Sequence, residues 1–211
     1  MSIIYLMRHG QVDNPTGVLY ERLPGFHLTQ LGRDMAAKSS QFFTDLPITH
    51  LRCSPLERTR ETMEPVAALF PDLEILHDDQ VIEAGNKFAG QVMGASGKAI
   101  KNPKNWPLVL NPLRPSWGEA YAEIAERMFT AIRESAEIVG DNGQAVIVSH
   151  QLPIWVAHLR ATGRRLFHDP RKRQCSLTSI TGFSVDQGQI SVVSYDEPAR
   201  ELLPNPPMFG F

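Results

Sequence analysis

Short, uninterrupted runs of apolar residues alternate along this chain with longer segments in which apolar residues recur at helical spacing. Residues 3–7 and 145–148 are continuous apolar runs, the pattern of strands that are covered on both faces of a sheet. Strands are predicted at residues 3–7, 48–53, 74–76 and 145–148, and a closing hairpin at 176–185 and 189–195. These strands provide the expected framework of a sheet.

The helical segments lie between these strands. Helices are predicted at residues 29–46, from Ser54-Pro55 onward, at 117–139 and at 153–162. Thr29 is a good N-cap for the first helix, and Pro55 suits the first position of the second helix. Strands that alternate with amphipathic helices indicate an α/β fold, a three-layer α/β/α sandwich with a mostly parallel central sheet.

One segment departs from this alternation. Residues 84–117 contain repeated Gly and Pro breaks and no periodic pattern, so we interpret them as an irregular insertion or lid. With 211 residues, the chain is long enough for one domain with a sizeable core, and we expect residues 1–211 to form a single domain.

Two polar pairs directly follow the two most apolar strands. Arg8-His9 follows residues 3–7, and Ser149-His150 follows residues 145–148. Parallel sheets bind ligands beyond the carboxyl ends of their strands, so the two histidines are expected to meet at one edge of the sheet. Gly10 is expected to let the backbone turn close to a bound group.

Arg58 and Glu83 could join these residues, since Arg58 opens a predicted helix and Glu83 is expected directly after a strand. Phosphoryl transfer needs fixed cations and N–H donors around the three equatorial oxygens of the group in flight. The guanidinium fork of arginine suits phosphate oxygens. A neutral imidazole is a competent nucleophile near pH 7, and a carboxylic acid can protonate the leaving group.

The motifs that carry these residues resemble those of the histidine phosphatase superfamily, branch 1, the phosphoglycerate mutase-like enzymes. Leu-Met-Arg-His-Gly-Gln at 6–11 resembles the family's first histidine signature, and Val-Ile-Val-Ser-His at 146–150 resembles its second histidine strand. His-Leu-Thr-Gln-Leu-Gly at 27–32 resembles its helix start. Ser-Pro-Leu-Glu-Arg-Thr-Arg-Glu-Thr at 54–62 resembles the segment that carries its second arginine. The motifs follow one another in the family's order along most of the chain.

The resemblance implies a role for each residue. His9 would be the nucleophile that becomes phosphorylated, and Arg8 and Arg58 would hold the phosphate. His150 would be a further phosphate ligand. Glu83 would be the proton donor and later the base for water. The same resemblance implies a small phosphorylated substrate and neither cofactor nor metal.

Three assignments rest on less specific patterns. Asn14 lies near the family's phosphate-contacting Asn but one residue closer to the nucleophile. Gln151 stands where the family usually has Gly, and its amide could bind substrate or cap the following helix. Three other carboxylates are alternative candidates for the role assigned to Glu83: Asp78, Asp79 and Glu119.

The segment after Glu83 separates activities within the family. Cofactor-dependent mutases resemble Glu-Arg-x-Tyr-Gly there, whereas this chain reads Glu83-Ala84-Gly85-Asn86-Lys87-Phe88. The missing basic and tyrosyl residues favour a phosphatase over a mutase. A non-catalytic phospho-ligand binder is a third reading, although a pure binder has no need of the acid Glu83.

Composition narrows the remaining possibilities. A net charge of −2 argues against a general nucleic-acid binder, and no apolar run approaches the roughly 20 residues of a membrane span. Cys53 and Cys175 are expected to be reduced thiols in a cytoplasmic protein. The histidines show no metal-ligand spacing such as HExxH.

The sequence does not decide the role of two segments, a basic run and a Pro-rich tail. The basic run at 164–173 is interpreted as a solvated loop or as an electropositive rim that attracts a multiply charged substrate. The Pro-rich tail at 202–211 could cover a neighbouring subunit, cover the pocket or hang free. A homodimer is therefore a possibility that the sequence does not decide.

Overall fold

A computed structural model describes residues 1–91 and 118–204 of the chain. Most of the insertion expected at residues 84–117, and the end of the Pro-rich tail, lie outside these ranges. The described elements are β1 (Ser2–Arg8), α1 (Gln30–Ser40), η1 (Gln41–Phe43), β2 (Ile48–Cys53), α2 (Glu57–Ala67), β3 (Ile75–His77), η2 (Asp79–Val81), α5 (Tyr121–Val139), β4 (Gln144–Ser149), α6 (Gln151–Ala161), η4 (Pro170–Lys172), β5 (Ile180–Asp186), β6 (Gln189–Asp196) and η5 (Arg200–Leu202), where η marks a 3₁₀ turn.

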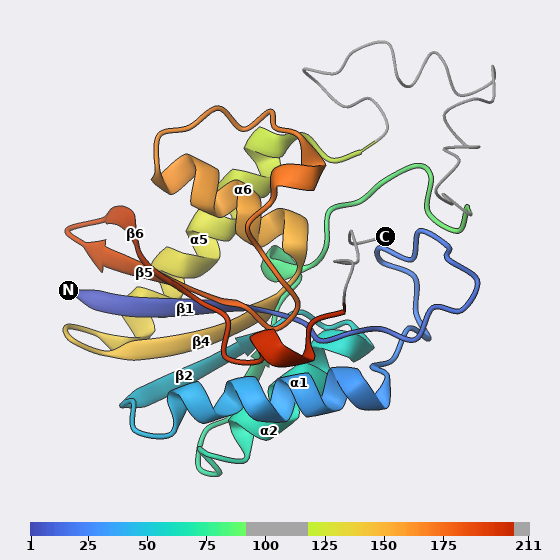
Figure 1. The fold of residues 1–211 in the computed structure, drawn as a ribbon. Coiled ribbons are helices and arrows are strands. Elements are labelled where there is room, and N and C mark those ends of the chain that lie inside the picture. Colours follow the sequence, from blue (N-terminus) through green and yellow to red (C-terminus); the bar gives the residue numbers. More distant parts are fainter. Residues whose placement is uncertain (92–117, 205–211) are drawn as a thin grey trace.

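The six strands form one sheet in the order β3-β2-β4-β1-β5-β6. The pairings β3–β2, β2–β4 and β4–β1 are parallel, and the closing hairpin adds β5 and β6 antiparallel to β1. Helices α5 and α6 cover one face of the sheet, and α1 and α2 cover the other (Figure 1). The expected three-layer α/β/α fold with a mostly parallel sheet is confirmed.

Alternation along β1 explains the two layers of core. Ile4 and Leu6 face the cluster that contains the buried side of α5, while Tyr5 and Met7 face the cluster that contains residues of α2. Ile4, Leu6 and Met7 have no exposed surface. Because a strand buried on both faces needs apolar residues at every position, the continuous run at residues 3–7 was a reliable signal.

Several helix boundaries differ from the predictions. The first helix changes to the 3₁₀ turn η1 after Ser40, and α5 begins at Tyr121 rather than at residue 117. Helix α2 begins at Glu57, with Leu56 at its N-cap, so the predicted start at Ser54-Pro55 is wrong. The Ser54 hydroxyl lies within hydrogen-bond distance of His150 instead of capping the N-terminus of α2, which has no side-chain cap.

The approach to Glu83 also differs from the prediction. Residues 79–81 form the 3₁₀ turn η2, and Glu83 follows this turn rather than a strand. The Asp78 side chain starts the turn by accepting from the Gln80 backbone N–H at 2.8 Å. An Asp at this position favours a capped turn over continued strand because its carboxylate takes the place of a sheet partner.

None of the helices described within residues 1–91 and 118–204 is both long enough and apolar enough to cross a bilayer.

Candidate active site

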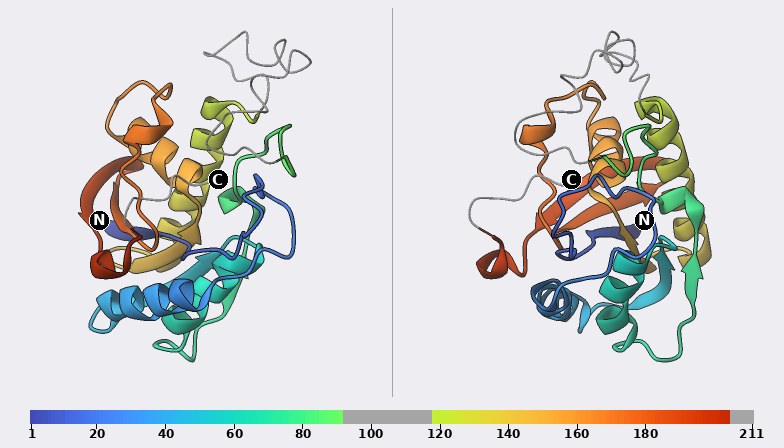
Figure 2. Two further views of the ribbon diagram at one scale, coloured as in Figure 1. Left: turned by 45° about the vertical axis from the view of Figure 1, so that its right-hand side comes forward. Right: turned by 90° about the vertical axis from the view of Figure 1, so that its right-hand side faces the viewer.

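The register of β1 and β4 places the two histidines side by side. Arg8, the last residue of β1, is paired with Ser149, and the His9 backbone N–H donates to the Ser149 carbonyl at 3.1 Å. The imidazole rings of His9 and His150 have centroids 5.3 Å apart at an interplanar angle of 61°. The ends of β1 and β4 that precede these histidines point toward the viewer in the right-hand view of Figure 2, together with the loop at residues 10–28.

The His9 ring is fixed in one orientation. Its Nδ1 lies 2.8 Å from the Gly10 carbonyl oxygen, and because a carbonyl can only accept, Nδ1 carries the proton. In the neutral ring the lone pair is therefore on Nε2. His9 is only 2% exposed, so few solvent molecules compete for this nitrogen.

Gly10 is required by close packing rather than by an unusual backbone angle. It is not among the described glycines with positive φ. A Cβ added at Gly10 would lie 2.4 Å from the Gly32 carbonyl oxygen, closer than real contacts allow. The Gly10 N–H donates to the Thr62 hydroxyl at 3.1 Å. Gly10 thus lets the start of α1 and the side of α2 approach the residue next to His9.

Arg8 and Arg58 are buried cations held by backbone carbonyls. Arg8 Nη1 donates to the Cys175 carbonyl at 2.6 Å, and Arg58 Nη2 donates to the Glu21 carbonyl. The Arg58 guanidinium also lies over the Tyr20 ring, 4.8 Å from its centroid. Neither arginine forms an ion pair with a described carboxylate, so both keep an uncompensated positive charge.

Several N–H donors of these residues have no partner among the described residues. They are Arg8 Nε, Arg58 Nε and Arg58 Nη1, together with the ring nitrogen Nδ1 of His150. A buried donor without an acceptor costs about 1–3 kcal/mol, and more when it is charged. A cluster of such donors beside His9 is therefore suited to an oxyanion, which would satisfy all of them together.

His150 is oriented by two serines. Its Nε2 lies 2.8 Å from the Ser54 hydroxyl, and the preceding Ser149 hydroxyl donates to the Val81 carbonyl at 2.7 Å. The Ser149 contact ties the end of β4 to the turn η2, which leads to Glu83. The two hydroxyl groups thus come from the ends of two adjacent strands, Ser54 directly after β2 and Ser149 at the end of β4.

Glu83 lies beside His150 at the mouth of the site. Its Oε2 is 3.9 Å from His150 Nδ1, and its Oε1 accepts from the Ala84 N–H at 2.8 Å. The side chain is 17% exposed, so solvent can reach it. Of the competing carboxylates, Asp78 pairs with Arg52, and Glu119 pairs with Arg22 and Arg127.

The backbone of Glu83 is held by Arg22, a residue of the loop at 10–28. Arg22 Nε donates to the Glu83 carbonyl at 2.7 Å, and Arg22 Nη2 donates to Glu119 at 2.9 Å. Glu119 also accepts from Arg127 Nε at 2.7 Å. A cavity of about 380 Å³ lies beside this network and is lined by Arg22, Asp79, Ile82, Gly85, Glu119 and Arg127. Glu83 itself does not line this cavity, which lies next to the backbone on either side of it.

The electrostatics of the site keep both histidines neutral. Burial, followed by the charges of Arg58 and Arg8, holds the pKa of His9 well below its ordinary value. Burial and Arg58 likewise hold the pKa of His150 well below its ordinary value. A neutral His9 keeps its Nε2 lone pair at pH values where a free histidine would be largely protonated.

Asn14 and Gln151 occupy different surroundings. The Asn14 amide is engaged within its own loop, donating to the Val18 carbonyl at 2.9 Å and accepting from the Val18 N–H at 3.2 Å. Both of its hydrogen bonds among the described residues go to Val18, and neither goes to His9. Gln151 lies in the first turn of α6, and its Nε2 donates to the Cys175 carbonyl at 3.4 Å. Because Arg8 donates to the same carbonyl, Gln151 adjoins the site.

Sequence reasoning missed the supports of the two arginines. The Cys175 carbonyl and the Glu21 carbonyl carry no side-chain signal, so no motif could reveal them. Glu21 has a φ of 35°, unusual for a residue other than glycine, and this turn aims its carbonyl at Arg58. Burial, with the charge of Glu83, raises the pKa of Glu21 to about 7. Thr62, which accepts from the Gly10 N–H, did carry a detectable signal. It is the last residue of the motif at 54–62 and stands four residues after Arg58 on α2.

Two findings concern metal binding and the reactivity of the cysteines. Within residues 1–91 and 118–204, no group of three or more His, Cys, Asp or Glu side chains is arranged to hold a metal ion. Cys53 and Cys175 are free and buried, and burial raises the pKa of the Cys53 thiol to about 12. A thiol with so high a pKa is a poor nucleophile at neutral pH.

Similar proteins were found at the levels of sequence and structure. An uncharacterized protein of Mycobacterium tuberculosis, Rv0525, is 44% identical over 196 residues, which is 93% of this chain and 96% of that protein. YhfR of Bacillus stearothermophilus matches with a TM-score of 0.76 at 20% identity over 92% of this chain and 96% of that one. Phosphoserine phosphatase of Entamoeba histolytica matches with a TM-score of 0.75 at 20% identity over 96% of this chain and 100% of that one.

The two structural matches are below 25% identity and show the fold alone. The family follows from the sequence: the model of the histidine phosphatase superfamily, branch 1, matches residues 4–198, nearly the whole chain. That range includes every residue of the site described above. This chain belongs to the histidine phosphatase superfamily, branch 1.

Proposed function

We propose that this protein is a phosphatase that hydrolyses a phosphomonoester through a phosphohistidine intermediate on His9. One observation carries the proposal: the Nε2 lone pair of a buried, neutral His9 stands among arginine N–H donors that have no partner among the described residues. The family supports phosphoryl transfer in general terms, since its members include phosphatases and mutases. The choice of a phosphatase rests on the residues that follow Glu83.

In the first step, His9 Nε2 attacks the phosphorus atom and the bond to the ester oxygen breaks. Arg8 and Arg58 stabilise the negative charge on the transferring oxygens. The Ser54 hydroxyl can donate to Nε2 of His150, which leaves Nδ1–H of His150 free to donate to a phosphate oxygen. Protonated Glu83 gives its proton to the leaving alkoxide, so the alcohol departs neutral.

In the second step, water replaces the alcohol. Glu83, now a carboxylate, takes a proton from water as its oxygen attacks the phosphorus atom, and the bond between phosphorus and Nε2 breaks. Inorganic phosphate leaves, and both His9 and Glu83 return to their starting protonation states. The 3.9 Å between Glu83 Oε2 and His150 Nδ1 supports these roles, because the proposed acid and the proposed phosphate ligand could then act on the same ester.

The test is turnover of p-nitrophenyl phosphate and a panel of phosphomonoesters by the wild type and by His9→Ala and Glu83→Gln. We expect His9→Ala to abolish turnover. Glu83→Gln should slow it by a factor of roughly 100 to 10,000, the range for loss of a general acid. His77→Ala is the matched control, because His77 also ends a strand but is exposed and remote from His9.

A second measurement tests the intermediate. Wild type mixed with substrate and quenched in alkali should carry one phosphoryl group on His9, and Glu83→Gln should accumulate it. Turnover that survives His9→Ala would contradict the phosphohistidine mechanism. Phosphoglycerate mutase activity that depends on a bisphosphoglycerate primer would favour the mutase alternative. Phosphate binding without any turnover would favour the non-catalytic alternative.

A further inference from the structure

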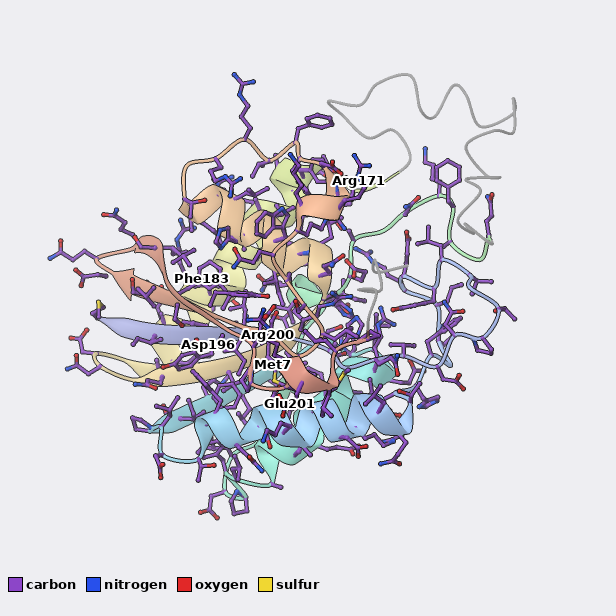
Figure 3. All side chains as sticks on the ribbon, viewed as in Figure 1. Met7, Arg171, Phe183, Asp196, Arg200 and Glu201 are labelled. Atoms are coloured by element: carbon purple, nitrogen blue, oxygen red, sulfur yellow. The ribbon has the colours of Figure 1, made fainter. Side chains whose placement is uncertain are left out.

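The basic run at residues 164–173 divides into two kinds of side chain. Arg171, labelled in Figure 3, lies on η4. Its side chain is 77% exposed and forms an ion pair with Asp169 at 2.8 Å. Arg173, two residues later, is partly buried and contacts Gln151 at the start of α6 instead. The expectation of a solvated loop therefore holds for Arg171 but not for Arg173.

Arg173 is held by two neutral partners. Its Nε donates to His168 Nε2 at 2.9 Å, and its Nη1 donates to the Gln151 side-chain oxygen at 3.3 Å. His168 Nδ1 donates to the Leu166 carbonyl at 2.6 Å, which leaves Nε2 as an acceptor. Burial, with the charges of Arg173 and Arg164, lowers the pKa of His168, so the ring stays neutral.

The charge of Arg173 is consequently not neutralised by its neighbours. No carboxylate oxygen among the described residues lies within ion-pair distance of its guanidinium, in contrast to Arg171. Hydrogen bonds to neutral acceptors offset part of the hydration that a partly buried cation loses, but they leave its positive charge unbalanced. Two side chains that fix its orientation without cancelling its charge are what an anion-binding arginine requires.

Arg173 adjoins the site through one side chain. Gln151 accepts from Arg173 and donates to the Cys175 carbonyl, which also accepts from Arg8 at 2.6 Å. The charges of Glu83 and Arg8 lie close enough to influence the pKa of Arg173, which burial lowers from its ordinary value. The third guanidinium thus stands on the α6 side of the site, next to the predicted phosphate ligands.

A count of charges indicates what Arg173 would bind. Arg8 and Arg58 together balance a phosphate dianion, and neither has a carboxylate partner among the described residues. With Glu83 protonated, as the proposed first step requires, Arg173 leaves one further positive charge near the phosphate. Its planar fork suits a carboxylate or a second phosphate.

We infer that Arg173 is a specificity-determining residue that binds a second anionic group of the substrate. The preferred substrates are then phosphomonoesters that carry a carboxylate or another phosphate close to the scissile phosphate. This inference rests on the proposed phosphatase activity and narrows its substrate class. Gln151 and His168 act as positioning residues for Arg173.

Matched substrate pairs test the inference. Phosphoglycerate and glycerol phosphate share a three-carbon skeleton and differ in a carboxylate or a hydroxymethyl group. Fructose bisphosphate and fructose monophosphate test a second phosphate in the same way. Phosphate release should give wild type a higher kcat/KM for the more anionic member of at least one pair.

The variants are Arg173→Gln and Arg173→Lys, with Arg171→Gln as the control that removes the same charge from the same loop. Arg173→Gln should lower kcat/KM for the preferred anionic substrate roughly ten- to a hundredfold, as for loss of a charge-assisted hydrogen bond. Its kcat/KM for p-nitrophenyl phosphate should change by less than about threefold. Arg173→Lys should fall in between, and Arg171→Gln should match wild type.

The outcomes separate the two proposals. If wild type hydrolyses none of these esters, the proposed phosphatase function fails and the inference fails with it. If wild type is active but Arg173→Gln and Arg173→Lys lower kcat/KM equally for every substrate, Arg173 serves the scissile phosphate and the inference alone is wrong. Activity without selectivity in wild type also overturns the inference alone.

Discussion

At the scale of single residues, the site works through protons that are fixed in place. The Gly10 carbonyl holds a proton on His9 Nδ1, and the arginines with the surrounding burial exclude a second one from Nε2. The stability of the fold is thereby linked to pH, because an unfolded chain releases both histidines to take up protons freely.

The buried, neutral histidines should make the fold less stable in acid. A depressed folded pKa means that His9 and His150 contribute stability above the unfolded pKa of about 6.5 and lose it as the pH falls further. The free energy of unfolding in urea should fall below pH 6.5, by up to about 1.4 kcal/mol per pH unit for each histidine. His150→Gln should show a shallower slope. An equally steep slope in this variant would contradict the assigned burial of a neutral His150.

Glu21 should act in the opposite direction. Its folded pKa is raised to about 7, so its contribution is present below the unfolded pKa of about 4.5 and is lost as the pH rises through 7. Over the interval in which the histidines lose stability on acidification, Glu21 therefore gains it. Urea unfolding of Glu21→Gln should show a steeper loss between about pH 6.5 and 4.5 than wild type, whereas Glu126→Gln, an exposed control, should follow wild type.

What could be predicted at this scale depends on how each contact is encoded. His9, Arg58 and His150 carry side-chain chemistry in recognisable motifs, and the structure brings them together with Glu83, which no motif marked. The Glu21 and Cys175 carbonyls are backbone groups, which every residue possesses, so nothing in the sequence marks them. The role of Asn14 stays a prediction, since its amide is engaged with Val18 in the described structure.

At the scale of elements, the site depends on close contact between backbone segments. The N-cap hydroxyl of Thr29 accepts from the Gly32 N–H at 2.9 Å and donates to the Gln11 side chain at 2.8 Å. The first turn of α1 is thereby fastened to the segment that leaves β1. The Pro55 signal misled the prediction of α2 because the preceding Ser54 serves His150 instead of a helix terminus.

Gly32→Ala should loosen this contact. An added Cβ would lie 2.1 Å from the Gln11 carbonyl oxygen, so backbone must move. Thermal unfolding should show a loss of about 1–3 kcal/mol. Gly85→Ala is the control, because its added Cβ would meet nothing closer than 3.6 Å and should leave the melting temperature nearly unchanged. A Gly32→Ala protein as stable as wild type would contradict the tight packing of α1.

Arg22 should matter for catalysis more than for stability. It joins the loop at residues 10–28 to the Glu83 carbonyl and to Glu119, so its loss frees the backbone that positions Glu83, the proposed acid. Arg22→Met should lower kcat roughly ten- to a hundredfold with little change in KM, because misplacement of a reacting group by about 1 Å has such effects. Arg22→Lys should restore part of the rate. Arg33→Met removes another half-exposed ion pair, the one with Glu61, and should keep the wild-type kcat.

At the scale of the whole molecule, the sheet gathers cations at one edge of a chain whose net charge is −2. The parallel strands bring Arg8 and His150 to that edge, and helix α2 adds Arg58. Sequence reasoning could predict this convergence because buried parallel strands have a strong apolar signature. It could not predict that Arg173 turns inward, because its contacts with His168 and Gln151 depend on how the loop after α6 folds back.

An oxyanion should therefore stabilise the folded protein. Vanadate or phosphate binding to the folded state alone raises the free energy of unfolding, by about 2.7 kcal/mol at a hundredfold excess over Kd. The melting temperature should rise with vanadate and remain unchanged in chloride of equal ionic strength. Arg58→Gln should remove most of the rise. An increase of equal size in Arg58→Gln would mean that the anion binds elsewhere.

The position of β1 in the sheet also orders events in time. This strand is made first, yet its parallel neighbour β4 begins at residue 144 and its antiparallel neighbour β5 at residue 180. During synthesis, the segment that carries His9 therefore has neither neighbouring strand until β4 and then β5 have left the ribosome. Folding dominated by such distant pairings is slow and leaves apolar segments uncovered meanwhile. The site is completed only after β4 and β5 have been made, so a nascent chain that stops short of them carries the first histidine without the surroundings that keep it neutral.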